Sequence, residues 1–120
     1  MSSPSRLRAR LQEILLNKGY KSFGDVLLNF LYSYHRYILV REIRGYKLRN
    51  EDLAKIFDKY LSQYFTRMDT HKKGDVIEGI VAYCFLHGLF SFQEMENLMK
   101  DEQFLEKLIK RCLEKLSDEL

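Results

Sequence analysis

The chain has 120 residues, of which 46% are hydrophobic, and only one proline and six glycines. This length suits a single domain over residues 1–120 with one buried core. The scarcity of turn residues argues against a sandwich or barrel and favours helices, and the net charge of +3 is too small to imply a nucleic-acid partner by itself.

Charge is distributed unevenly along the chain. Residues 1–50 hold ten Lys/Arg and three Asp/Glu, a net charge of +7, whereas residues 51–120 hold ten Lys/Arg and fourteen Asp/Glu, a net charge of −4. A basic half joined to an acidic half suits a protein that meets a polyanion on one side. Charges spread over solvated helix faces would explain the same numbers.

The first half of the chain predicts three helices. The first covers residues 4–17, with Ser3 as its N-cap and Pro4 at its first position. The second covers residues 22–43, stops at Gly45, and is apolar over more than half its circumference, which predicts a central position. The third covers residues 51–65, and Asn50 is its expected cap.

Three more helices follow. The fourth, over residues 75–87, ends at Gly88 and is predicted to be the second core helix. Ser91 and Glu94 form a capping box for a short fifth helix to about residue 100, and Asp101 opens the last helix. No segment has a strand pattern. We therefore expect an all-α domain of about six helices around two central helices.

The cysteines and the apolar segments bear on location. Cys84 and Cys112 lack the spacing of a zinc site and fall on apolar helical positions, which predicts buried thiols in a reducing compartment. No signal-type apolar run precedes the first helix, and residues 26–40 are too polar and too few to span a membrane. We expect a cytoplasmic protein.

Two helices share a motif near their predicted starts. FGDV occupies residues 23–26 and KGDV occupies residues 73–76, and Glu78 follows Asp75 by one helical turn. If these helices lie side by side, Asp25, Asp75 and Glu78 converge. Converging carboxylates repel one another, and a bound divalent cation is the usual reason for such an arrangement.

Two interpretations of these acids remain open. Ser22 with Asp25, and Asp75 with Glu78, have the spacing of capping boxes, and acidic residues are common at helix starts. Alternatively, the carboxylates hold Mg²⁺, which takes oxygen ligands together with water and substrate phosphates. Two such ions can stabilise the attacking and leaving oxygens of a phosphodiester.

The two motif helices resemble those of a known family. FGDVLLNFLYSY, beginning at residue 23, is similar to the signature helix of ribonuclease III, and KGDVIEGIVAYCFLHG, beginning at residue 73, resembles its second catalytic helix. Together with residues 69–73, the chain most resembles the short archaeal ribonuclease III-like proteins, which lack a double-stranded-RNA-binding domain. The resemblance covers roughly residues 5–100.

The resemblance implies a fold, an activity and a site. The fold would be an all-α endonuclease domain, and the activity Mg²⁺-dependent (or Mn²⁺-dependent) hydrolysis of double-stranded or structured RNA by a homodimer. Asp25 would be the signature-helix carboxylate, Asp75 and Glu78 the second-helix pair, and Glu78 the most direct metal ligand.

The chain departs from the family pattern at two positions. Bacterial members carry glutamates four and seven residues before the signature aspartate, where this chain has Lys21 and Lys18. The resemblance therefore leaves the number of metal ions open. Glu13 and Asp69 are the candidate replacements.

Four lysines, Lys18, Lys21, Lys72 and Lys73, are predicted beside the acids and would contact RNA phosphates. The other interpretation is that they form a solvated rim.

His71 and His87 are interpreted as helix-end or surface residues or, alternatively, as ligands. The many aromatic residues fit either a dimer interface or a full core. A binding module without catalysis and a helical protein-interaction scaffold also remain open.

Overall fold

Six α-helices make up the computed structural model, which describes residues 4–120. The predicted N-cap Ser3 lies outside these described residues. No strand occurs among them, so the all-α prediction is confirmed. The helices are α1 (Pro4–Leu16), α2 (Lys18–Val40), α3 (Asn50–Tyr60), α4 (Thr70–Leu86), α5 (Phe92–Leu98) and α6 (Phe104–Glu119), with a short 3-10 helix at Ser62–Tyr64.

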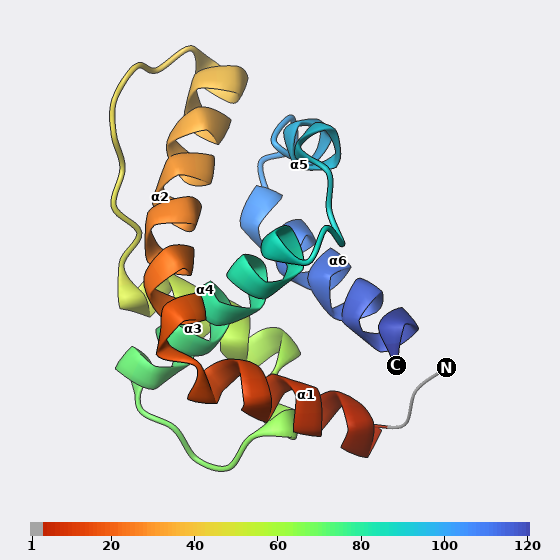
Figure 1. Cartoon of the computed structure of the whole chain (residues 1–120). Coiled ribbons are helices and arrows are strands. Elements are labelled where there is room, and N and C mark those ends of the chain that lie inside the picture. Colours follow the sequence, from red (N-terminus) through yellow and green to blue (C-terminus); the bar gives the residue numbers. More distant parts are fainter. Residues whose placement is uncertain (1–3) are drawn as a thin grey trace.

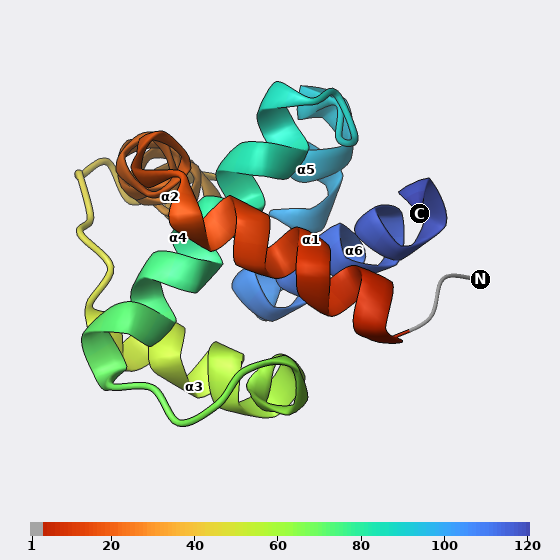
Figure 2. The ribbon, with the colours of Figure 1, turned by 60° about the horizontal axis from the view of Figure 1, so that its bottom comes forward.

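Helix α4 lies at the centre of the structure. It packs against α1, α2, α3 and α6, and Figure 1 shows α2 on one side of it and α6 on the other. Figure 2 shows α1 crossing the same bundle above α3. All residues from Val76 to Cys84 are buried, Glu78 included. A helix surrounded in this way must be apolar on every face, which explains the composition of this segment.

Helix α2 is less central than its composition suggested. Leu27, Leu28 and Leu31 are buried, but Val26 and Phe30 on its outer side are 71% and 52% exposed. The predicted central position therefore holds for the side of α2 that packs against α4 and not for its outer side. Its extra apolar residues lie on the surface of the single chain.

Both motif helices begin earlier than predicted. α2 begins at Lys18, because the Asn17 side chain accepts a hydrogen bond from the Gly19 backbone N–H. α4 begins at Thr70, with the Asp69 side chain accepting from the Lys72 N–H. The glycines and polar residues of these first turns resemble a loop in sequence alone. Asp25 and Asp75 consequently lie inside their helices, and the capping interpretation of both is wrong.

Other helix ends differ as well. α2 stops at Val40, because Arg41 adopts a left-handed conformation (φ 60°) well before the predicted stop at Gly45. Residues 41–49 then run beside α2 towards α3 (Figure 1). α3 has Arg49 rather than Asn50 at its N-cap position, and it ends at Tyr60, short of the predicted residue 65.

The last two predicted starts have opposite outcomes. The Ser91–Glu94 capping box is present, with both of its hydrogen bonds, so that prediction is confirmed. The last helix begins at Phe104, not at Asp101. The Asp101 side chain instead accepts a hydrogen bond from the Gln103 N–H in the preceding turn.

Helices α2 and α4 touch through their backbones. A Cβ atom placed on Gly24 would lie 1.9 Å from the Glu78 carbonyl oxygen, far inside any permitted contact. Only glycine allows the two helices to come this close at this point. The glycine that precedes Asp25 is therefore a packing residue within α2.

Replacing Gly24 with alanine is expected to destabilise the protein by about 3 kcal/mol or more, since backbone atoms of α4 would have to move. Gly45→Ala is the matched control, because nothing lies within 4 Å of the added Cβ; we expect a change within about 0.5 kcal/mol. Urea unfolding followed by circular dichroism measures both. Equal stability of Gly24→Ala and wild type would contradict the backbone contact.

Candidate functional site

An open cavity of about 660 Å³ lies between α2, α4 and the residues that lead into α3. It collects the three predicted carboxylates, Asp25, Asp75 and Glu78, on one surface. It is lined by Lys18, Lys21, Ser22, Asp25, Lys47, Leu48, Arg49, Asn50, Glu51, His71, Asp75 and Glu78.

Asp25 and Glu78 form a carboxyl pair where α2 and α4 cross. Glu78 is only 7% exposed. Burial raises the pKa of Glu78 to about 8, and its hydrogen bond to Asp25 and the negative charges of Asp25 and Asp75 act in the same direction. Two carboxyl groups can share a hydrogen bond only when one carries a proton. Near neutral pH, Glu78 therefore donates to Asp25.

Asp75 lies on the same cavity but has different neighbours. One of its oxygens is 3.6 Å from the Lys21 Nζ, and the other is 3.9 Å from the His71 Nε2. The His71 Nδ1 in turn is 3.1 Å from the Asn50 side-chain amide. His71 is the second residue of α4, so it is not the N-cap, which is Asp69. The His71 side chain lines the same cavity as the carboxylates. Lys21 partly offsets the charge that Asp75 adds near Glu78.

The structure separates the four predicted lysines into two pairs. Lys18 and Lys21 line the cavity. Lys72 and Lys73 do not, and the Lys73 Nζ is 2.6 Å from an Asp58 oxygen on α3. Lys72 and Lys73 both belong to the first turn of α4 and not to the loop before it. In this position Lys73 contacts Asp58 of α3 and not the carboxylates.

Three charged residues of the cavity are not among the site residues predicted from the sequence. Lys47 and Arg49 come from the basic segment that follows Gly45, and Glu51 comes from the start of α3. The basic run was a signal for the first two, but only the path of residues 41–49 along α2 brings it to the acids. The candidate replacement acids do not join them: Asp69 caps α4.

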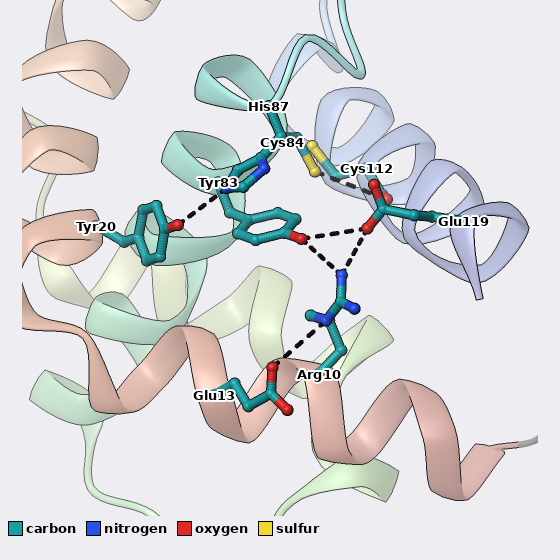
Figure 3. A network of polar contacts seen from close by, with 8 residues as sticks. All are labelled: Arg10, Glu13, Tyr20, Tyr83, Cys84, His87, Cys112 and Glu119. Atoms are coloured by element: carbon teal, nitrogen blue, oxygen red, sulfur yellow. Dashed lines mark hydrogen bonds and ion pairs between the residues drawn. The ribbon is translucent and has the colours of Figure 1, made fainter.

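Glu13, the other candidate replacement, belongs to a polar network at the opposite end of α4. It lies 3.6 Å from Arg10, whose Nη1 donates to the Tyr83 hydroxyl and to Glu119, both at 2.6 Å (Figure 3). His87 is bonded to Tyr20 in the same network.

This network joins α1, α2, α4 and α6 and shares no residue with the carboxylate cavity. Its role is therefore to hold helices together. Cys84 and Cys112 lie beside it as buried free thiols, as predicted from their positions.

A family comparison covers most of the chain. A family model described as Ribonuclease III matches residues 18–117 of the chain. The chain belongs to the ribonuclease III family. The match includes both motif helices and every residue that lines the carboxylate cavity. A search of curated proteins found no match.

The arrangement of the acids bears on whether the cavity could hold a metal ion. Between residues 4 and 120, no three His, Cys, Asp or Glu side chains are grouped so that they could hold a metal ion as they stand. Asp25 and Glu78 are nevertheless hydrogen-bonded to each other. A proton and a cation have the same effect here, since each relieves the repulsion between two neighbouring carboxylates.

The raised pKa of Glu78 predicts how stability depends on pH in chelator. Between about pH 4.5 and 8 the unfolded chain releases this proton while the folded protein keeps it. Stability therefore falls as the pH rises through this window, by at most about 1.4 kcal/mol per pH unit. Glu78→Gln cannot ionise, so it should lack this fall and be more stable than wild type at pH 8.

Urea unfolding at pH 5 and pH 8 in chelator measures the difference. Glu114→Gln, which removes an exposed carboxylate on α6, is the control and should keep the wild-type pH dependence. The same fall in stability in Glu78→Gln and wild type would show that Glu78 is not the group that holds the proton.

Proposed function

We propose that the chain is a metal-dependent endoribonuclease that hydrolyses phosphodiester bonds of double-stranded or structured RNA. Family membership supports an RNA-cleaving nuclease domain in general terms. The observation that carries the proposal is the hydrogen-bonded pair of Asp25 and the buried Glu78, which opens onto a cavity with a basic rim. We further propose that residues 1–120 act as one catalytic domain in the cytoplasm.

The donor atoms fit a hard divalent cation, Mg²⁺ or Mn²⁺. Mg²⁺ keeps several waters and needs only one or two carboxylates besides the substrate, and Asp25 and Glu78 provide two that already face each other. When bound, the metal supplies an activated water and neutralises charge on the phosphodiester. Asp75 faces Lys21 and His71, and its negative charge would add to the attraction of the cavity for a cation.

The rest of the cavity suits an RNA backbone. Lys18, Lys21, Lys47 and Arg49 surround the acids, and cationic side chains beside the reacting phosphate bind the neighbouring phosphates in a salt-dependent way. Double-stranded RNA is recognised mostly by shape and backbone, so a cavity of this kind needs no base-specific groups. Lys72 and Lys73, which lie outside the cavity, would contact RNA only at a distance from the acids.

An exposed apolar surface on α2 supports the proposed homodimer. We define the α2 stripe as the exposed apolar residues on the outer side of this helix. Phe92 of α5 stacks beside the stripe, 6.4 Å from the Phe30 ring centroid. Such a surface rich in aromatic residues is typical of a protein interface. The stripe consists of Phe23, Val26, Phe30, Tyr37 and Val40.

One observation favours the alternative, an RNA-binding or protein-interaction module that has kept the fold without the activity. Lys21 stands where bacterial relatives carry a glutamate, and its ammonium group lies 3.6 Å from Asp75. A lysine there lowers the local negative charge that attracts a cation. Such a module would bind RNA equally well with and without metal.

The activity is tested on a long RNA duplex, in Mg²⁺ and in chelator. We expect wild-type protein to cleave it only in Mg²⁺. Glu78→Gln should lower the rate by more than about 100-fold, because even an outer partner of a metal ligand is worth about 10- to 100-fold. Glu13→Gln, outside the cavity, should cleave like wild type. RNA binding without cleavage by folded wild type would favour the inactive module.

The dimer is tested by mass measurement in solution. We expect wild type to have twice the 14.4 kDa mass of the chain, and Val26→Asp to be a monomer, because a charge would be buried in the interface. Leu16→Asp is the control: Leu16 is 82% exposed but lies at the end of α1, not on the α2 stripe. A wild-type monomer at high concentration, or a dimeric Val26→Asp variant, would contradict this interface.

A further inference from the structure

Three polar residues follow one face of α2 from the carboxylate cavity outward. Asp25, Asn29 and Ser33 are four residues apart, so their side chains lie one above another on the helix. Hydrogen bonds join them in order. The Asn29 Nδ2 donates to the Asp25 Oδ1 at 3.3 Å, and the Ser33 Oγ donates to the backbone carbonyl oxygen of Asn29 at 2.8 Å.

The side chains of Asn29 and Ser33 also hold the segment of residues 41–49 against α2. The Tyr46 backbone N–H donates to the Ser33 Oγ at 2.7 Å, and the Leu48 N–H donates to the Asn29 Oδ1 at 2.8 Å. Backbone groups two residues apart in an extended segment face the same way. Residues 46 and 48 therefore bind α2 together, and Lys47 and Arg49, in the same stretch, line the cavity.

The orientation of the Asn29 amide is fixed by its neighbours. A carboxylate can only accept a hydrogen bond and a backbone N–H can only donate one. The amide nitrogen must therefore face Asp25 and its oxygen must face Leu48. No other standard side chain of this length has one donor end and one acceptor end.

We infer that Asn29 is a positioning residue that couples the basic segment to the carboxylate site. It sets the direction of the Asp25 carboxylate and, through Leu48, the position of Lys47 and Arg49. Asn29 thus contacts both the proposed metal ligand Asp25 and the segment that carries Lys47 and Arg49. This inference rests on the proposed function, since it assigns Asn29 a role in presenting Asp25 to a metal.

Ser33 provides a matched control for Asn29. Each side chain holds one backbone N–H of the same segment, but only Asn29 contacts Asp25. Asn29→Ala and Ser33→Ala should therefore release one segment contact each, at Leu48 and at Tyr46 respectively. Amide hydrogen exchange at these two residues measures that release, and circular dichroism confirms folding.

The test is the affinity of metal-free protein for Mn²⁺, measured by calorimetry without RNA. We expect Asn29→Ala to weaken Mn²⁺ binding by about 10- to 100-fold, the usual cost of losing an outer partner of a metal ligand, and Ser33→Ala to stay within about twofold of wild type. In cleavage assays, Asn29→Ala should lower kcat, whereas Ser33→Ala should affect KM alone. If Asn29→Ala does not fold, Asn29→Ser replaces it in the same comparison.

The outcomes separate this inference from the proposed function. Wild-type affinity in folded Asn29→Ala, or an equal loss in Ser33→Ala, would overturn the positioning role while leaving the metal site intact. Absence of Mn²⁺ binding by wild type would contradict the proposed metal site and the inference with it.

Discussion

The contact between the backbones of α2 and α4 at Gly24 and Glu78 is the constraint on which the site depends. A helix pair usually keeps its axes apart by the width of its side chains, but here there is no side chain on the α2 side of the crossing. The residue after the glycine, Asp25, is thereby carried next to Glu78.

This arrangement places a carboxyl group where the core would otherwise be apolar. Burial of Glu78 beside two other acids keeps its proton on, and the cost is offset by cations drawn from elsewhere in the chain. The basic first half supplies Lys18, Lys21, Lys47 and Arg49 to the cavity, whereas the acidic second half supplies most of its carboxylates. The basic and acidic halves of the sequence thus both contribute charged side chains to a single cavity.

Periodicity predicted the parts of the fold that depend on apolar burial. The core character of α4, the all-helical class and the capping box at Ser91 follow from patterns that local physics enforces. The sequence predicts starts for α2 and α4 that are too late, because Gly19 and Gly74 resemble helix breaks. Gly74 instead lies inside α4, where an added Cβ would meet the Asn50 side chain at 2.8 Å. That close approach is a tertiary fact that no local pattern contains.

The path of residues 41–49 could not be predicted from the sequence either, because tertiary contacts determine it. A segment without periodicity takes its position from its partners, here the side chains of Asn29 and Ser33 on α2. The adjoining side of this helix carries the α2 stripe, and Phe30 and Tyr37 of the stripe line one cavity together with Ser33. If two copies meet through that stripe, the helix that presents Asp25 also sets the distance between the two sites. One rigid element would then fix both the geometry within a site and the spacing between sites, which is the property that a pair of cuts across an RNA duplex requires.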